Sequence, residues 1–183
     1  MRGAAGSAAA NADAVITSGG VSVGEADHTK QVMAELGDVL FWRIAMRPGR
    51  PMAIGRISPD TSAGGHGAIL FGLPGNPVAV MVTFYALVRD ALLAMSGAAA
   101  QPMPLLRAAS TAPIRKKPGR TEYQRGIVSR SADGSLQVAL TGSQGSGILR
   151  SMSEANGLLV LHHEQGNVAP GEPVDVLMFD GLV

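Results

Sequence analysis

The chain contains no cysteine and few aromatic residues, and both absences narrow the functions open to it. Without cysteine among its 183 residues, it cannot form disulfide bonds, bind zinc through thiolates or use a thiol nucleophile. Aromatic residues make up only 4% of the sequence, which disfavours a nucleic-acid site built on base stacking. The net charge of +1 provides no global field that would attract DNA or a membrane. We therefore expect neither nucleic acid nor a membrane as a partner.

Long apolar runs and a targeting segment are also missing. The longest apolar stretch, Val78 to Val88, is interrupted by Thr83, whereas a bilayer span needs about 20 residues. The first ten residues are rich in alanine and glycine and do not resemble a signal peptide. Together with the absence of cysteine, these features favour a cytoplasmic protein.

A glycine-rich turn follows the short apolar strand expected at Ala14–Thr17. Its glycines allow the backbone to approach a bound anion closely, and its serine can donate a hydroxyl hydrogen bond. Its two carboxylates would repel a bare phosphate, but they suit a cation such as Mg²⁺ that bridges carboxylate and phosphate. The candidate ligands in this turn are Gly19, Gly20, Ser22, Gly24, Glu25 and Asp27. The spacing alone leaves an anion cradle and an ordinary strand–helix turn equally open.

Pro74, Gly75 and Asn76 form a second turn, directly after another apolar strand. Asn76 suits the N-cap of a helix and Pro77 suits its first position, so we predict a helix here that Gly97 terminates. The helix dipole would point at the turn and favour an anion. The second turn is therefore a further candidate anion site, and it is also consistent with a well-capped core helix.

Three arginines lie between the two turns without an acidic partner nearby in the sequence. Arg43, Arg47 and Arg50 occupy a stretch that contains no aspartate or glutamate. We expect one strand over Val39–Met46, which would place Arg43 and Arg47 on one face about 13 Å apart. Because guanidinium groups match oxyanions and ligand sites follow strand ends in α/β proteins, we favour anion binding over a solvated positive edge.

The order of apolar segments predicts two domains. Residues 1–98 alternate strands with helices, which indicates an incomplete doubly wound, mostly parallel α/β sheet. Residues 99–104 form a linker. Residues 105–183 contain short strand-like runs separated by turns, which is typical of a small all-β, barrel-like domain.

The second domain contains two features for which we expect structural roles. Residues 107–130 carry seven basic side chains and one acid, Glu122, and such a run is usually a solvated face. His66, His162 and His163 lack the spacing of metal ligands, so we interpret them as structural.

Five motifs occur in one order and carry a family resemblance. They are Ser18–Asp27, Arg47–Pro51, Gly72–Val78, Pro118–Arg120 with Gln124–Gly126, and Gly142–Ser146. Through them the chain resembles, from about Asp13 onward, the C-terminal part of molybdopterin molybdenumtransferases, the MoeA and gephyrin E-domain family. The resemblance implies a role in molybdenum cofactor biosynthesis, in which molybdate is inserted into adenylylated molybdopterin with Mg²⁺ assistance and AMP is released.

The resemblance also implies roles for individual residues. Asp27, Arg47 and Arg50 would be catalytic, and Asp27 with Glu25 would hold Mg²⁺. The substrate and anion ligands would be Gly19, Gly20, Ser22, Gly24, Pro51, Pro74, Gly75, Asn76, Arg125 and Ser146. No covalent nucleophile is needed, because catalysis would consist of positioning and electrostatic stabilisation.

Some features depart from the family pattern. Arginine replaces a frequent lysine at positions 43, 47 and 50, and Ala79 replaces a frequent serine. The family's N-terminal domains are absent from this chain, so we expect it to be inactive alone and to need those domains and a homodimeric partner. An adenylyltransferase-type domain and a non-enzymatic scaffold like the gephyrin E domain remain alternatives. The β domain disfavours the first of these, and no sequence feature supports a receptor-binding groove.

Overall fold

The structure, a computed structural model, describes residues 7–19, 37–58, 67–99, 101–145 and 147–179. The chain divides into two compact units. The first comprises Met1–Ile44 and Gly49–Ala98, and the second comprises Ala45–Pro48 and Ala99–Val183. The short segment Ala45–Pro48 therefore joins the second unit, although the sequence prediction assigned it to the first domain.

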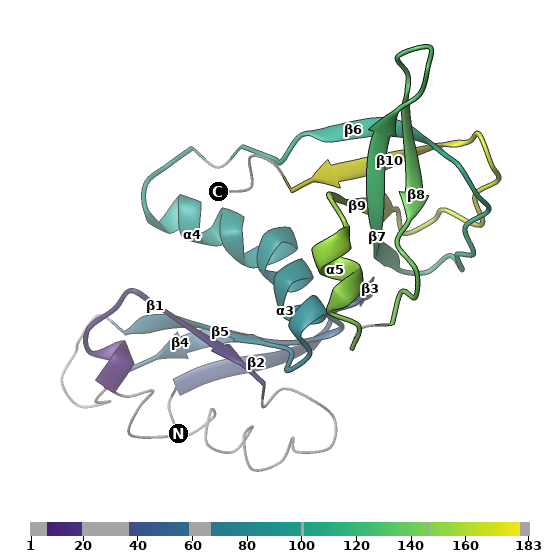
Figure 1. Ribbon diagram of the computed structural model, residues 1–183. Helices are drawn as coiled ribbons and strands as arrows, with labels where there is room; N and C mark the ends of the chain where they lie inside the picture. Colours follow the sequence, from purple (N-terminus) through teal and green to yellow (C-terminus); the bar gives the residue numbers. More distant parts are fainter. Residues whose placement is uncertain (1–6, 20–36, 59–66, 100, 146, 180–183) are drawn as a thin grey trace. The chain divides into compact units, whose positions relative to one another are not determined.

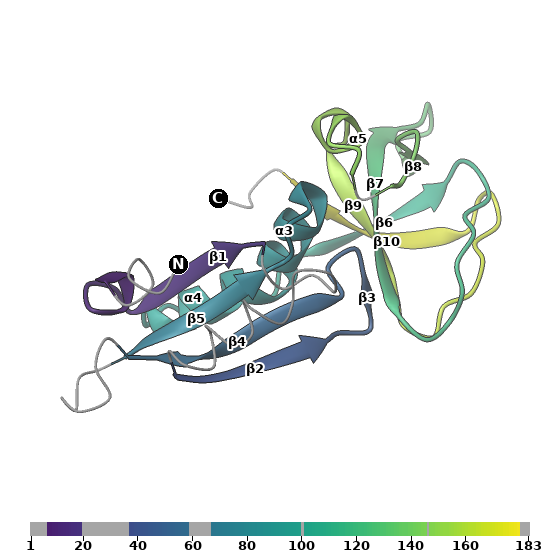
Figure 2. The same ribbon diagram turned by 90° about the horizontal axis from the view of Figure 1, so that it is seen from below.

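The first unit contains a four-stranded mixed sheet, which Figure 2 shows from below. Its strands, in spatial order, are β1 (Ala14–Ser18), β5 (Ala68–Leu73), β4 (Pro51–Ile57) and β2 (Gly37–Arg43). Only β1 and β5 are parallel, whereas β5–β4 and β4–β2 are antiparallel. The sheet is therefore mixed rather than mostly parallel, and the predicted doubly wound arrangement is not confirmed. β2 and β4 are joined by a short connection, which permits antiparallel pairing, whereas parallel neighbours need a long crossover.

The predicted strand Val39–Met46 is divided between the two units. β2 ends at Arg43, and Ile44 N donates to Arg50 O at 2.8 Å across the connection. β3 (Met46–Arg47) then pairs in parallel with β7 of the second unit. The expected common face for Arg43 and Arg47 is therefore wrong, because the chain leaves the sheet between them.

A continuous helix lies over one face of the four-stranded sheet (Figure 1). It consists of α3 (Pro77–Thr83), a π-helical turn η1 (Phe84–Val88) and α4 (Arg89–Met95). At its end, Gly97 adopts φ 79°, Gly97 N donates to Ala94 O at 3.1 Å, and Ala98 N donates to Leu93 O at 3.0 Å. This is the Schellman arrangement, and it confirms Gly97 as the residue that terminates the helix.

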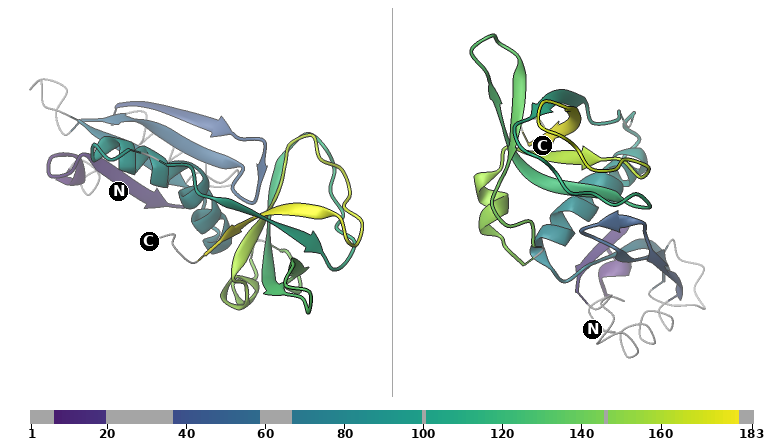
Figure 3. Two further views of the ribbon diagram at one scale, coloured as in Figure 1. Left: turned by 90° about the horizontal axis from the view of Figure 1, so that it is seen from above. Right: turned by 90° about the vertical axis from the view of Figure 1, so that its right-hand side faces the viewer.

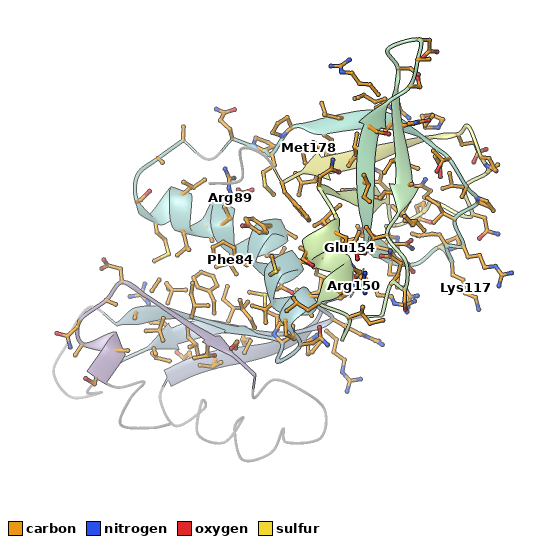
Figure 4. All side chains as sticks on the ribbon, in the orientation of Figure 1. Phe84, Arg89, Lys117, Arg150, Glu154 and Met178 are labelled. Atoms are coloured by element: carbon orange, nitrogen blue, oxygen red, sulfur yellow. The ribbon has the colours of Figure 1, made fainter. Side chains whose placement is uncertain are left out.

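The two faces of the sheet bury different clusters. On the helix side, Met52, Phe71, Leu73 and Val88 form a core against which Phe84 packs, as labelled in Figure 4. The opposite face buries Ala53, Ile57, Ala68 and Leu70, with Ala9 packed against them. Adjacent residues of one strand thus face opposite sides, as strand geometry requires.

The helix passes one test for a membrane span, by length and composition only. Pro77–Met95 has 19 residues and a mean hydropathy of 1.8. This helix is longer than the apolar stretch from Val78 to Val88 that the sequence analysis considered. Phe84 and Val88 pack on the unit's own sheet, whereas Met81, Leu87 and Met95 are exposed, so packing within the unit accounts for only part of the apolar character of this helix.

The second unit is built on a five-stranded barrel, which confirms the barrel-like prediction. Its strands, in spatial order, are β7 (Thr121–Arg130), β8 (Leu136–Leu140), β6 (Leu105–Ser110), β10 (Pro173–Met178) and β9 (Gly157–Leu161). β9 pairs again with β7 and so closes the barrel. The β7–β8 hairpin extends beyond the other strands (Figure 3). β9 and the short helix α5 (Arg150–Glu154) were not predicted from the sequence.

Alternation along β7 determines which of its side chains enter the barrel. Val128 belongs to the interior core, so Gly126 and Gln124 face inward as well, whereas Arg125 faces outward. A Cβ on Gly126 would lie 2.3 Å from Leu159 Cδ1, so the core leaves no room for a side chain there. The outward-facing Arg125 therefore lies against α5 and the loop that precedes it, rather than in the core.

Candidate functional site

The two glycine-rich turns meet at one edge of the first unit. β1 and β5 are parallel with Ser18 opposite Leu73, so both strands end at the same edge. Gly19 N donates to Leu73 O at 3.0 Å, and a Cβ on Gly75 would lie 3.3 Å from Gly19 Cα. This edge follows the carboxyl ends of two parallel strands, which is where α/β proteins bind ligands.

The N-terminus of α3 is less open to an anion than the sequence indicated. Asn76 Oδ1 accepts hydrogen bonds from Val78 N at 3.2 Å and Ala79 N at 3.4 Å. Pro77 has no N–H, and Val80 N donates to the Asn76 carbonyl at 2.9 Å. The cap therefore uses the first amides of the helix. The amides of Gly75 and Asn76, which precede the helix, have no acceptor within the described parts of the chain.

The remaining predicted residues of the first unit lie in different environments. Pro74 is buried, Gly75 is exposed, and Pro51 begins β4 half-buried. Arg50 is exposed in the connection between β2 and β4, and it forms no ion pair with any acid that the structure describes. Gly20, Ser22, Gly24, Glu25, Asp27 and Ser146 lie outside the described residues.

Arg125 is the most deeply buried charged side chain of the described chain, with 1% of its surface exposed. Its Nε donates to Ser151 Oγ at 3.1 Å, and its Nη2 donates to the carbonyls of Gly145 at 3.0 Å and Ser143 at 3.4 Å. None of these acceptors is a carboxylate. Burial lowers the pKa of Arg125, and the nearby positive charge of Arg47 lowers it further.

The main chain of Arg125 is held by a side-chain amide. Gln144 Oε1 accepts from Arg125 N at 2.8 Å, and Gln144 Nε2 donates to Arg125 O at 3.1 Å. Thr141 N also donates to Arg125 O at 3.0 Å. Gln144 was part of a quoted sequence motif, but sequence reasoning assigned it no role.

A buried carboxylate lies on the inward face of the same strand. Glu122 is 4% exposed, and its two oxygens accept from Arg120 Nε at 2.8 Å and from Gln124 Nε2 at 3.1 Å. It stands opposite Arg47 in the β3–β7 register. Sequence reasoning noted Glu122 only as the one acid in a basic run, and that isolation was the available signal.

The expectation that residues 107–130 form a solvated face is wrong at two positions. Lys116 is 4% exposed and Arg125 is 1% exposed. Lys116 Nζ donates to Gln165 O at 2.9 Å and Lys117 O at 3.1 Å. The barrel therefore buries two of these cations against carbonyl and hydroxyl oxygens instead of exposing them to water.

Metal ligands do not gather in the described part of the chain. No three His, Asp or Glu side chains there lie close enough to hold one ion. His162 Nε2 and Asp175 Oδ2 are 2.7 Å apart, and His163 Nδ1 and Glu164 Oε1 are also 2.7 Å apart. Glu25 and Asp27, the predicted Mg²⁺ ligands, lie outside the described residues.

These observations define a two-part protein: an α/β unit whose two glycine-rich turns meet at one edge of its sheet, and a β-barrel with a buried arginine that no described carboxylate neutralises. Family comparisons agree with both parts. Residues 2–94 match the family described as "Probable molybdopterin binding domain", and residues 107–179 match "MoeA C-terminal region (domain IV)". The chain belongs to the molybdopterin-binding family that includes MoeA and gephyrin, which confirms the resemblance.

Individual relatives support the same membership. The chain is 41% identical over 177 residues to "Molybdopterin molybdenumtransferase" of Haemophilus influenzae, covering 96% of this chain and 42% of that protein. It is 32% identical to "Gephyrin" of Dictyostelium discoideum, covering 91% of this chain and 25% of that protein. A solved structure, "Molybdenum cofactor biosynthesis protein" from Pyrococcus furiosus, aligns with a TM-score of 0.67 and 26% identity, covering 97% of this chain and 53% of that one. The chain thus spans less than half the length of the first two relatives.

Proposed function

We propose that this chain is the C-terminal part of a molybdopterin molybdenumtransferase, which inserts molybdate into adenylylated molybdopterin and releases AMP. The relative from Haemophilus influenzae carries that name and matches almost the whole chain. The barrel disfavours the alternative of an adenylyltransferase-type domain, because residues 107–179 match the C-terminal region of MoeA.

One observation carries the assignment of the anion site. Arg47 and Arg125 are close enough for their charges to interact, and neither forms an ion pair with a carboxylate that the structure describes. Two neighbouring guanidiniums repel each other unless an anion lies between them. A compact dianion such as molybdate would remove this repulsion, and guanidinium groups are suited to bind oxyanions. Ser146 would add a hydroxyl donor to this site.

The paired turns of the first unit supply a second binding surface. The amides of Gly75 and Asn76, which have no acceptor among the described residues, would donate to phosphate oxygens of the pterin nucleotide, beside Gly19. Gly20, Ser22 and Gly24 of the first turn would line the same edge. Arg50, an exposed cation, and Pro51 would contribute to anion binding on the first unit. In this scheme the protein acts by positioning and electrostatic stabilisation, without a covalent nucleophile.

The finer parts of the proposal concern Mg²⁺ and assembly. Glu25 and Asp27 are the candidate Mg²⁺ ligands, and the ion would neutralise phosphate charge as AMP departs. The proposed complete protein is a cytoplasmic homodimer in which N-terminal domains of the same protein complete the site. The chain spans 42% of the Haemophilus relative, which supports the need for further domains.

Molybdate titration by calorimetry at low ionic strength tests the proposed anion site. We expect the chain to bind molybdate and Arg47→Ala to weaken binding about tenfold, as loss of one charge-assisted contact predicts. Arg115→Ala, which removes an exposed arginine elsewhere on the barrel, is the matched control and should leave binding unchanged. Absence of molybdate binding by the unaltered chain, or equal effects of the two substitutions, would refute the site. AMP release from adenylylated molybdopterin by this chain alone would refute the need for further domains.

A further inference from the structure

Gln144 takes the place of a neighbouring strand beside Arg125. The β7–β8 ladder ends at the pair Gly126–Leu140, and beyond it Thr141 N still donates to Arg125 O at 3.0 Å, but β8 supplies no acceptor for Arg125 N. The Gln144 amide supplies that acceptor, because its Oε1 accepts from Arg125 N at 2.8 Å, and its Nε2 also donates to Arg125 O at 3.1 Å. Both polar groups of one peptide backbone residue are thus paired by a single side chain.

The hold is mutual. Arg125 Nη2 donates to the carbonyls of Ser143 and Gly145, the two residues that flank Gln144. Each side chain therefore binds the main chain of the other segment. Because the C=O and N–H of a trans peptide point in opposite directions, the Ser143 carbonyl turns the Gln144 N–H away from the guanidinium. That N–H has no acceptor within the described residues.

Burial limits what Arg125 can do directly. Because only 1% of the Arg125 surface is exposed, an anion cannot contact its guanidinium from several sides, as it can contact the guanidinium of an exposed arginine. Two of its nitrogens, Nε and Nη2, are already bonded to Ser151, Ser143 and Gly145. An anion that approaches this charge meets the loop of residues 143–145 as well as the guanidinium itself.

We infer that Gln144 is a positioning residue of the anion site and that Arg125 acts largely through the loop it shares with Gln144. The two side chains lock residues 143–145 in one arrangement, so that the outward amide of the loop and the buried positive charge act on one anion. This inference rests on the proposed oxyanion function and names the residue that prepares its site.

The chain provides a matched control for Gln144. Asn156 Oδ1 accepts from Val128 N at 2.7 Å, and Asn156 Nδ2 donates to Val128 O at 2.9 Å. The contact is of the same kind, on the same strand, three residues further along. Asn156 has no hydrogen bond to residues 143–145 among those described. Gln144→Met and Asn156→Leu each keep the approximate side-chain size and remove both polar groups without adding a charge.

The experiment measures molybdate affinity and thermal unfolding for the unaltered chain and both variants. Both substitutions should lower Tm, because Gln144→Met leaves Arg125 N without its acceptor and Asn156→Leu leaves Val128 N and O without their partners. Only Gln144→Met should also weaken molybdate binding, by about tenfold, since loop geometry rather than charge is lost. The salt dependence of binding should stay as in the unaltered chain, because no charge has been removed.

Arg125→Lys provides an independent variant in case Gln144→Met does not fold. Lysine keeps the positive charge but cannot bridge Ser143, Gly145 and Ser151 with one planar group. Binding should therefore weaken as much as in Gln144→Met. Wild-type affinity in Arg125→Lys, or equal loss of affinity in Gln144→Met and Asn156→Leu, overturns the positioning role. Absence of molybdate binding by the unaltered chain overturns the proposed function itself, and the two failures are thereby distinguished.

Discussion

Gly19 and Gly75, which lie far apart in the sequence, come so close that a Cβ on Gly75 would be 3.3 Å from Gly19 Cα. Gly19 N also donates to Leu73 O at 3.0 Å. The two turns therefore form one structural feature at the end of the parallel β1–β5 pair. The atom nearest to a Cβ on Gly75 is the backbone Cα of Gly19, which cannot move aside as the end of a flexible side chain would.

Substitution of Gly75 should disturb this contact. We expect Gly75→Ala to lower the free energy of unfolding by about 1 kcal/mol, because the new methyl group pushes against the backbone of Gly19. Gly166→Ala is the control, since a Cβ there meets nothing within 4 Å. Urea denaturation of both variants measures the difference, and equal stabilities would contradict the close approach.

Lys116 should be needed for stability, unlike its neighbour in the sequence. Its Nζ donates to the carbonyls of Gln165 at 2.9 Å, Lys117 at 3.1 Å and His163 at 3.5 Å. Lys116→Met removes the ammonium donor from the Gln165 and Lys117 carbonyls and leaves the His163 carbonyl only its bond from Gly119 N, so we expect a loss of about 2 kcal/mol in urea denaturation. Lys117→Met, at the exposed position labelled in Figure 4, should change stability by less than about 0.5 kcal/mol. Similar losses in both variants would show that the buried ammonium has no special role.

Glu122 should stabilise the barrel through its two hydrogen bonds. Glu122→Ala leaves Arg120 Nε and Gln124 Nε2 without their acceptor, and we expect it to cost about 2–3 kcal/mol of unfolding free energy. Glu164→Ala removes an exposed carboxylate that pairs with His163 and should cost less than about 1 kcal/mol. The comparison is made by chemical denaturation at neutral pH. A Glu122→Ala variant whose free energy of unfolding equals that of the unaltered chain would contradict the proposed structural role.

The tip of the β7–β8 hairpin should contribute to acid sensitivity. Hydrogen bonds to Asp133 from Ser131 Oγ, Ser135 N and Ser135 Oγ lower its pKa from 3.8 to about 2. A depressed carboxyl pKa means that the ionised form stabilises the fold above pH 3.8, and that this contribution disappears as the pH falls through 2.

Asp133→Asn tests this dependence because it removes the charge and keeps the shape. The variant should have a lower Tm than the unaltered chain at pH 7, and the difference should shrink as the pH approaches the folded-state pKa of about 2. Calorimetric scans at both pH values measure it. A difference in Tm that does not change with pH would argue that the hydrogen bonds do not depend on ionisation.

Local sequence rules predicted several elements correctly. Asn76 caps the helix that begins at Pro77, and Gly97 ends it in the left-handed region. The barrel-like character of the second part was also predictable, because its strands are short and separated by glycine turns such as Gly134 and Gly171, both with positive φ. Each of these features depends on residues close together in the chain.

Pairing direction was not predictable by the same rules. The sequence predicts one apolar strand over Val39–Met46, yet β2 ends at Arg43, and Met46 and Arg47 pair with β7 of the barrel. β9 is buried along its whole length and shows none of the polar alternation by which exposed strands are found. The partner of a strand is chosen by segments distant in the sequence, and hydropathy alone does not identify them.

The sequence by itself determined the family, the two ends of the helix over Pro77–Met95 and the barrel-like character of the second part, because motifs, caps and hydropathy periods are local properties. Only the tertiary structure decided that Lys116, Glu122 and Arg125 are buried and which oxygens and nitrogens they bond. It also decided that Gln144 pairs with the main chain of Arg125. The physical reason is that a charged side chain can be buried only where hydrogen-bonding groups from distant segments surround it, and folding alone assembles those groups.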